Sequence, residues 1–389
     1  MAGAALTGVL VVFSFPLFGF EVGLDGLIWV ALLPLFLSAA GAGSRRGLLL
    51  GLCSGLILES AGFIWILLAI RRFTGLPSAV ASLLFLFWLL YAALPWGILG
   101  AALGRCARPA SVLWVLPLWV GVEHYFPRLF PWHLGGAFYG REWLLQNADL
   151  LGASGLTGLV FLSSAVLFLL LGFFRGKNGF PAISLSIFAL LVAGGLLYGR
   201  LRVEEVEGAA ARAPRVKVLL VQGALEPSER EERGLEVYLA RTRELLRAGE
   251  KPDLVVWPEG ADPFFFNLTP GGDPWLSHGH HLDGGWRPVR FDRDLSVPLV
   301  TGAGGLVDGR LPASSNVAAF LVPGKPPAFY EKNKRLLFGE QVPFIDLLPV
   351  SVRRDLLGHV GTIAAGTENR RLSLGGASIR SLICYEAVL

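Results

Sequence analysis

Three residues whose side chains could together transfer an acyl group lie in the second half of this 389-residue chain. Glu259 follows the segment Asp253–Trp257, Cys384 follows Ser378–Ile383, and Lys332 lies between them in the sequence. A thiol is only slightly ionised at neutral pH, so a nucleophilic cysteine needs a base, and Glu259 is the candidate. A nearby lysine would favour the thiolate and stabilise the oxyanion of a tetrahedral intermediate. The three residues therefore predict acyl transfer through a thioester on Cys384.

The other candidate bases, nucleophiles and metal ligands carry weaker signals. Histidine is the usual base for a thiol, but none of the six histidines stands at the end of a predicted strand. His278, His280 and His281 fall in an irregular segment, where a solvated polar loop is expected more often than a metal cluster. Cys53 lies within an apolar run and Cys106 at the edge of one, without partners at metal-ligand spacing. We therefore predict no cofactor and no metal site, and two inert buried thiols.

An α/β domain over residues 215–389 is predicted to position the three residues. Its helix is expected at 228–248, where apolar residues recur at helical spacing between charges, and residues 267–297 are expected to form a long loop. Functional groups in α/β sheets lie past the carboxyl ends of strands, so Glu259, Lys332 and Cys384 are expected to meet in one cleft. The predicted strands are Arg215–Val221, Asp253–Trp257, Pro298–Gly302, Asn316–Val322 and Ser378–Ile383.

The first half of the chain predicts a membrane-embedded helical bundle over residues 1–200. The whole chain is 53% hydrophobic and only 16% charged, against about a quarter charged in soluble proteins. A span needs about 20 mostly apolar residues. A charged, alanine-rich linker is expected over residues 201–214. About seven spans are predicted, at Ala4–Phe20, Leu27–Gly43, Gly47–Ile70, Ser78–Leu103, Ser111–Phe126, Gly155–Phe174 and Phe180–Tyr198.

Loop charges predict which side of the membrane each part occupies. Arginines and lysines in the second, fourth and sixth loops place the N-terminus in the cytoplasm, and seven crossings then put the α/β domain outside. Arg71 and Arg72, in the third loop, argue against this orientation, although they could face phospholipid headgroups. Glu59 lies within a predicted span and is expected to face the bundle interior or water, in either a structural or a functional role.

Two further patterns bear on partners. Residues 127–154 form a connection rich in aromatic residues and glycine, which predicts either an interfacial aromatic belt or the wall of a lipid-accessible cavity. The formal charge of +4 comes without a basic stripe interleaved with aromatics, so nucleic-acid binding is not expected.

The residues around the three candidates carry a family resemblance. The segments VVWPEGA, YEKNKRLLFGEQVPF and ICYEAVL resemble the three motif blocks of the nitrilase, or carbon–nitrogen hydrolase, superfamily. Within it, the combination with an N-terminal multispan bundle looks like the apolipoprotein N-acyltransferases, which the segment FPWHLGGAFYG and the strand ending in Gln222-Gly223 also resemble. The resemblance covers nearly the whole chain.

The resemblance implies an αββα sandwich with Glu259 as general base, Lys332 as oxyanion stabiliser and Cys384 as nucleophile. Lys332, and not Lys334, has the family's spacing to the Phe-Gly-Glu motif. A phospholipid would acylate the cysteine, and the acyl chain would pass to the α-amine of the diacylglyceryl-cysteine that begins an apolipoprotein. The implied location is the bacterial inner membrane, with the catalytic domain on the periplasmic face. The implied supporting residues are Glu340, Tyr385 and Glu386.

Two features leave alternatives open. Family members continue beyond the Cys-Tyr-Glu block with further strands and a last span, so this chain, which ends at Leu389, is expected to be partial or truncated and its sandwich incomplete. Phe264, Phe265 and Phe266 could contact acyl chains or pack in the sandwich core. The alternative functions are a membrane-anchored nitrilase-type amidase with water as the acceptor, and a non-catalytic remnant.

Overall fold

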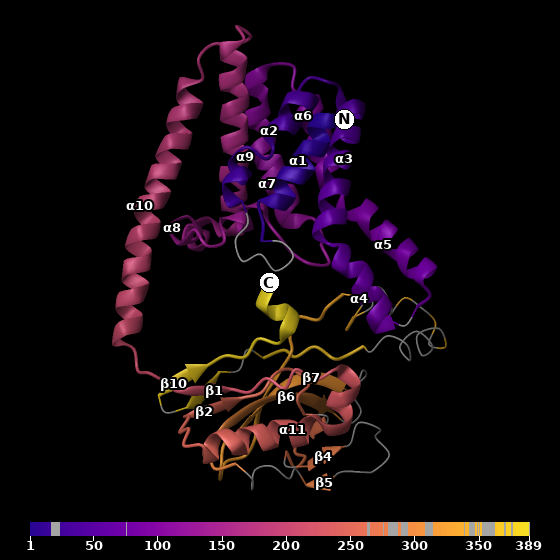
Figure 1. Cartoon of the computed structure of the whole chain (residues 1–389), viewed down its shortest axis with the longest axis vertical. Helices are drawn as coiled ribbons and strands as arrows, with labels where there is room; N and C mark the ends of the chain where they lie inside the picture. Colours follow the sequence, from indigo (N-terminus) through magenta and orange to yellow (C-terminus); the bar gives the residue numbers. More distant parts are fainter. Residues whose placement is uncertain are drawn as a thin grey trace. The chain divides into compact units, whose positions relative to one another are not determined.

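The computed structural model divides the chain into two compact units, Met1–Arg212 and Ala213–Leu389, which are described separately (Figure 1). The structure describes residues 1–16, 24–74, 76–262, 265–274, 276–278, 287–288, 295–307, 314–337, 339–341, 347, 349, 351, 362–368, 371–374 and 376–388. Phe264, His280, His281 and Phe338, which the sequence analysis discussed, lie outside the described residues, as does the side chain of His278.

The described secondary structure of the first unit is all helical. Its elements are α1 (Ala2–Phe13), η1 (Asp25–Trp29), α2 (Leu33–Ala39), α3 (Ser44–Gly62), α4 (Ile64–Thr74), α5 (Ser78–Ala92), α6 (Leu94–Gly104), η2 (Pro109–Trp114), α7 (Val115–Tyr125), η3 (Leu134–Phe138), α8 (Glu142–Leu145), α9 (Ala148–Phe174) and α10 (Ala182–Arg212).

Helix length separates the apolar runs of this unit into two groups. Among the described residues, three helical stretches are long and apolar enough to cross a membrane, namely Ser78–Gly104, α9 and α10. The pair α3 and α4, bent by 51°, makes a fourth if it is counted as one span. The other three predicted runs form shorter helices, partly because 3-10 turns at η1 and η2 interrupt them. An apolar run indicates that a segment can lie in lipid, but it does not indicate whether the segment forms one continuous helix.

A stripe of glycines brings α3 and α6 into backbone contact. A Cβ atom on Gly47 would lie 2.1 Å from the Gly100 carbonyl oxygen, and one on Gly51 would lie 1.9 Å from that of Trp96. Small residues at four-residue spacing allow such close packing between membrane helices, where apolar burial contributes little. Glu59 stands two helical turns beyond Gly51 on the same face of α3, so the packing of this stripe turns it inward.

The last two helices of the unit run side by side in opposite directions (Figure 1). Asp149 near the start of α9 accepts hydrogen bonds from Tyr198 and Arg202 of α10, at 2.6 and 3.0 Å. Most of the segment Leu201–Pro214, which we expected to be a linker, belongs to α10, which continues to Arg212. Alanine and charged residues suit an exposed helix as well as they suit a linker.

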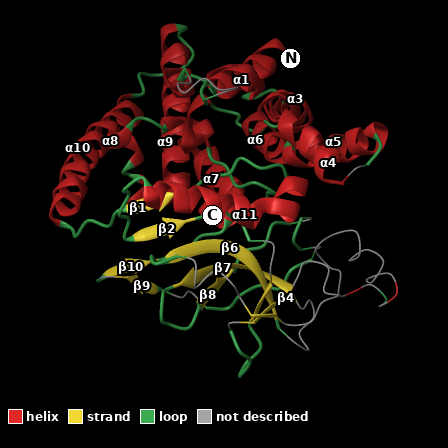
Figure 2. Ribbon diagram, turned by 60° about the horizontal axis from the view of Figure 1, so that its bottom comes forward, coloured by secondary structure: helices red, strands yellow, loops and turns green. Residues whose placement is uncertain are grey.

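In the part of the second unit that the structure describes, the main sheet is mixed and has eight strands. Strands β1, β2, β6 and β3 are parallel, β4 and β5 extend the β3 edge in antiparallel pairing, and β7 and β8 pair antiparallel beside β6 (Figure 2). The strands are β1 (Val218–Leu220), β2 (Leu254–Val256), β3 (Phe265–Asn267), β4 (Leu276–His278), β5 (Arg287–Pro288), β6 (Leu299–Leu306), β7 (Ser314–Leu321) and β8 (Ala328–Glu331). A separate pair contains β9 (Leu372–Leu374) and β10 (Ala377–Ile379).

Helix α11 (Pro227–Arg247) confirms the predicted helix at 228–248 and packs on the sheet through Tyr238, which stacks on Trp257 at 5.6 Å between ring centroids. Two predictions for this unit are wrong. The strand expected at Ser378–Ile383 ends at Ile379 and joins the small sheet, and the loop expected at 267–297 contains β4 and β5. The αββα sandwich that the resemblance implies stays a prediction.

Candidate active site

Glu259 stands on a tight turn after β2. Trp257 fixes the start of this turn, because its indole donates a hydrogen bond to Thr242 of α11 at 3.0 Å. Gly302 in β6 lies so close that a Cβ atom there would meet the Glu259 Cα at 2.5 Å. Gly260 adopts φ +65°, which favours glycine over every other residue. These local backbone constraints fix the position of the Glu259 Cα atom, from which the side chain extends.

Lys332 follows β8, and its position is set by the pairing of β7 with β8. The Lys332 backbone N–H donates to the Asn316 carbonyl oxygen at 2.9 Å, which makes these two residues cross-strand neighbours. Directly opposed residues in an antiparallel pair project their side chains from the same face. The Asn316 side chain donates from Nδ2 to Glu259 Oε1 at 2.5 Å, so Asn316 links the lysine segment to Glu259.

The Lys332 ammonium lies between two carboxylates. Its Nζ atom is 2.6 Å from Glu340 Oε1 and 4.0 Å from Glu259 Oε1, and the side chain is fully buried. The other Glu340 oxygen accepts from the Leu336 backbone N–H at 2.8 Å, which fixes that carboxylate. A buried lysine is stable as a cation only when it is paired in this way.

Cys384 is the first residue of the 3-10 turn η6 (Cys384–Val388) and has φ +49°. A non-glycine residue in the left-handed region is uncommon, and such strained residues cluster at functional sites. Partial desolvation raises the pKa of the Cys384 thiol, and the negative charge of Glu259 and a hydrogen bond to it raise this pKa further, while Lys332 lowers it. The sulfur therefore lies within interaction range of both other candidates, as a neutral thiol that needs a base.

Glu386 ties the turn that carries Cys384 to the segment that carries Lys332. Its carboxylate accepts hydrogen bonds from the backbone N–H groups of Ile383, Asn333 and Lys334, at 2.9, 2.7 and 3.0 Å, and from the Tyr330 hydroxyl at 2.9 Å. Burial alone would raise the pKa of the Glu386 carboxyl, but these donors outweigh it and hold the pKa below its ordinary value of 4.5. Burial and Glu386 together raise the pKa of Tyr330 to about 12.

The structure therefore brings Glu259, Lys332, Cys384 and Glu340 together, and it places Glu386 behind them as a brace. Tyr385 lies beside Cys384 in the chain and is nearly buried, which raises the pKa of its hydroxyl.

Asn316 is the residue that sequence reasoning missed. It begins the predicted strand Asn316–Val322, and a polar side chain in an otherwise apolar strand is the signal that could have found it. Phe266 is fully buried and packs on Phe329 at 5.2 Å between ring centroids, so this member of the Phe264–Phe266 run belongs to the core.

Chemically, the arrangement provides a thiol close enough to a carboxylate and an ammonium group for both to act on its pKa, and these two groups lie 4.0 Å apart. A carboxylate in this position can remove the thiol proton, and an ammonium can stabilise an oxyanion that forms next to the sulfur. Among the described residues, no group of three or more histidine, cysteine, aspartate or glutamate side chains is arranged to hold a metal ion.

Comparison with known proteins covers both units. Residues 7–166 match the family described as apolipoprotein N-acyltransferase N-terminal domain. A protein of Geobacter metallireducens named apolipoprotein N-acyltransferase is 30% identical over 99% of this chain and 72% of its own length. Proteins of the same name from Chlorobaculum tepidum and Pseudomonas syringae pv. tomato are each 28% identical, over 98% and 93% of this chain and over 74% and 70% of their own lengths. This chain belongs to the apolipoprotein N-acyltransferase family.

Proposed function

We propose that this protein moves an acyl chain from a membrane phospholipid to the α-amine of a lipoprotein's N-terminal diacylglyceryl-cysteine, through a thioester on Cys384. The observation that carries the proposal is the clustering of the three groups: the Lys332 ammonium lies 4.0 Å from the Glu259 carboxylate, and both act on the pKa of the Cys384 thiol, which Glu259 raises and Lys332 lowers. The names of the relatives support the acceptor, and the apolar helices of the first unit support a membrane location.

In the first half of the reaction, Glu259 takes the proton from the Cys384 sulfur as the sulfur attacks the ester carbonyl carbon of the phospholipid. The carbonyl oxygen gains the negative charge, and the Lys332 ammonium stabilises it. The intermediate then breaks its bond to the glycerol oxygen, which takes the proton from Glu259. A lysophospholipid leaves, and the acyl chain remains on the enzyme as a thioester.

In the second half, the acceptor amine attacks the thioester carbonyl. Glu259 accepts a proton from the amine nitrogen, Lys332 again stabilises the oxyanion, and the carbon–sulfur bond breaks. The Cys384 sulfur recovers its proton from Glu259, and the lipoprotein leaves with an amide-linked acyl chain. Glu340 and Glu386 act in this scheme by holding Lys332 and the two backbone segments in place, through the hydrogen bonds described above.

The proposal also assigns a setting to the two units. The first unit lies in the bacterial inner membrane, and the second lies on its outer face, where lipoprotein acceptors with a free amine are exposed. The loop charges of the sequence support this orientation.

The test is to incubate membranes containing the full chain with a phospholipid whose acyl chain carries a label. We expect a label on Cys384 that neutral hydroxylamine releases, and its transfer to an added peptide that begins with diacylglyceryl-cysteine. Cys384→Ala should abolish both, whereas Cys53→Ala and Cys106→Ala, which change the other two thiols, should retain both. Hydrolysis of small amides without a labelled enzyme would favour the amidase, and no covalent label at all would refute the mechanism.

A further inference from the structure

Phe265, in β3, lies in the same row of the main sheet as two residues of the candidate site. Strand pairing places Phe265 beside Gly304 of β6, and it places Gly304 opposite Asn316 of β7. The row ends at Lys332, whose backbone N–H donates to the Asn316 carbonyl oxygen. Residues paired across neighbouring strands project from one face of a sheet, so Phe265, Asn316 and Lys332 share the face that carries the candidate site.

Glycine at position 304 allows the Phe265 ring to lie close to the site. A Cβ atom on Gly304 would lie 2.2 Å from the Cδ1 atom of Phe265 and 2.4 Å from its Cε1 atom, so the ring occupies the space that a larger residue would fill. Gly302, on the same face of β6, likewise leaves room for the Glu259 Cα atom. A glycine within a strand often marks such a close approach. At these two positions the site-bearing face of β6 is backbone alone, covered by the Glu259 turn and by an aromatic ring.

Phe265 and Phe266 follow one another in β3, so they project to opposite faces of the sheet. Phe266 is fully buried in the core that α11 covers, where it packs on Phe329. Phe265 lies on the other face and is partly exposed. Core packing on the α11 side therefore accounts for Phe266, and it leaves an aromatic surface at Phe265 in the row of the site residues.

An apolar surface at this position is useful in acyl transfer, because the acyl group begins with a polar carbonyl and continues as hydrocarbon. Glu259, Lys332 and Glu340 bring only charged groups to the described part of the site. In the thioester the carbonyl carbon is bonded to the Cys384 sulfur, so the first methylene groups start beside these charges. Contact with apolar surface stabilises methylene groups, whereas charged groups retain water or polar partners.

We propose that Phe265 contacts the first methylene groups of the acyl chain while the carbonyl carbon is bonded to Cys384. The inference rests on the proposed function, and it assigns to that site the residue that receives the chain as it leaves the charged groups. Asn316 donates a hydrogen bond to Glu259, which raises the pKa of the Cys384 thiol, so the row leads directly to the sulfur. The ring covers Gly304, one strand spacing of about 4.8 Å from Asn316, and about four methylene groups span that distance.

Soluble activated esters measure this contact without a bilayer or a phospholipid. The purified full chain is treated with p-nitrophenyl acetate, whose acyl group has no methylene groups, or with p-nitrophenyl hexanoate, whose acyl group has a short run of them. In both reactions the Cys384 sulfur takes the acyl group and p-nitrophenolate leaves, and peptide mass identifies the acylated cysteine. We expect the ratio of the hexanoyl rate to the acetyl rate to fall roughly tenfold in Phe265→Ala, and by less in Phe265→Leu, which keeps an apolar side chain.

The ratio of the two rates cancels any effect on the chemistry that both esters share, and acetylation in a variant shows that its site is folded. Gly304→Ala tests the contact by an independent route, because its Cβ atom would displace the Phe265 ring, and it should lower the same ratio. Two exposed apolar residues serve as controls that should leave the ratio unchanged. These are Phe174→Ala at the end of α9 and Leu382→Ala, shortly before Cys384.

Failure of this inference can be told apart from failure of the proposed function. If neither ester acylates Cys384 in the wild type, the thioester mechanism is wrong and the acyl contact is wrong with it. If both esters acylate Cys384 but Phe265→Ala and Gly304→Ala keep the wild-type ratio, the contact is refuted while the mechanism stands. A fall in Leu382→Ala as large as that in Phe265→Ala would show that the ratio does not report the row of Phe265, and it would also overturn the inference.

Discussion

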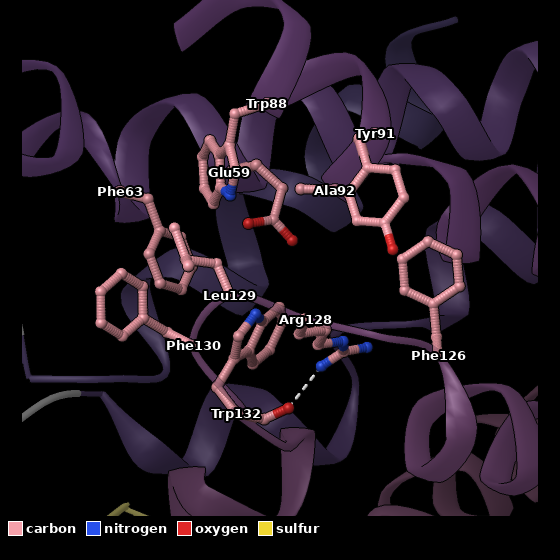
Figure 3. Close-up of a pocket in the computed structure, with 10 residues that line it drawn as sticks. All are labelled: Glu59, Phe63, Trp88, Tyr91, Ala92, Phe126, Arg128, Leu129, Phe130 and Trp132. Atoms are coloured by element: carbon pink, nitrogen blue, oxygen red, sulfur yellow. Dashed lines mark hydrogen bonds between the residues drawn. The ribbon is translucent and has the colours of Figure 1, made fainter. Parts of the chain in front are cut away.

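Glu386 in the second unit and Glu59 in the first are both buried acids, 8% and 3% exposed, yet their surroundings differ. Glu386 accepts hydrogen bonds from three backbone N–H groups and a tyrosine hydroxyl, whereas Glu59 accepts none among the described residues. The first carboxylate is satisfied by the protein that surrounds it, and it stabilises the backbone that carries the candidate site. The second faces a small pocket lined by aromatic side chains (Figure 3).

The backbone that carries these residues differs in the same way. In the second unit, strand pairing positions the Lys332 backbone, and a turn with a positive φ positions Cys384. In the first unit, a glycine stripe fixes the approach of two helices, and Glu59 is carried inward on the same face. Sheet register positions single side chains, whereas helix packing positions whole faces.

The largest effect is expected from Glu259→Gln. Loss of a general base should slow formation of the labelled acyl-enzyme by about 10²–10⁴-fold. The same change should lower the pKa of the Cys384 thiol toward its ordinary value of 9.0, because the charge and the hydrogen bond of Glu259 raise it. Iodoacetamide should then alkylate Cys384 at lower pH than in the wild type, while acyl transfer falls. Glu236→Gln, on the exposed face of α11, is the control and should change neither acyl transfer nor alkylation. If acyl transfer and alkylation of Cys384 fell together in Glu259→Gln, the assignment of Glu259 as the base would be contradicted.

Glu386→Gln should destabilise the second unit by about 2–3 kcal/mol at neutral pH, because a neutral amide has one acceptor oxygen for donors that now share a carboxylate. The folded pKa of Glu386 lies below the ordinary 4.5, so its contribution is complete above pH 4.5 and is lost as the pH falls through the lower folded pKa. Thermal unfolding at several pH values, with hydrogen exchange of the Asn333 and Lys334 amides, measures this effect. Glu244→Gln on α11 is the control. If Glu386→Gln were as stable as the wild type at pH 7, Glu386 would not stabilise the fold and the contrast with Glu59 would disappear.

Gly51→Ala should destabilise the first unit by about 1–3 kcal/mol, since its Cβ atom would lie 1.9 Å from the Trp96 carbonyl oxygen. Gly62→Ala, in the same helix, is the matched control, because a Cβ atom there meets nothing within 4 Å. Thermal unfolding in detergent compares the two. Similar midpoints would show that the glycine stripe does not set the packing of α3 on α6.

Asn316→Ala should slow acyl-enzyme formation roughly tenfold, the effect of losing about 1.4 kcal/mol from one hydrogen bond to a charged group. Asn316→Asp should be slower still, because it places a second carboxylate against Glu259. Single-turnover labelling of Cys384 gives both rates. Wild-type rates in both variants would remove Asn316 from the site.

The smallest effect is expected from Glu59→Gln on stability. No hydrogen bond among the described residues is lost and a buried unpaired charge is removed, so the unfolding midpoint should not fall. Thermal unfolding midpoints of Glu59→Gln and Glu386→Gln, measured side by side, test the comparison directly. A loss above about 2 kcal/mol at Glu59 would mean that it is a structural residue of the bundle.

Much of the second unit could be predicted from sequence because its elements are short and locally encoded. The helix at 228–248 and the strand before Glu259 follow from apolar periodicity and a β-rich run, and the structure has α11 and β2 there. Strand β8, which precedes Lys332, was not predicted. The strand at Ser378–Ile383 was overextended, because its apolar residues could equally pack from a coil, as Ile383 does against Ala318 and Tyr330. In the first unit, composition marked the apolar segments but not where 3-10 turns break them.

The sequence by itself determined the two-part character of the chain, its family resemblance and the residue types of an acyl-transfer site. These properties depend on composition and on motifs a few residues long, which can be recognised without knowing any long-range contact. Only the tertiary structure decided that Asn316 links Glu259 to the lysine segment, that Glu386 braces two segments some 50 residues apart, and that Glu59 faces Arg128 across an aromatic pocket. Each depends on which distant segments pair or pack, and pairing depends on the register of strands and the approach of helices, which local sequence does not specify.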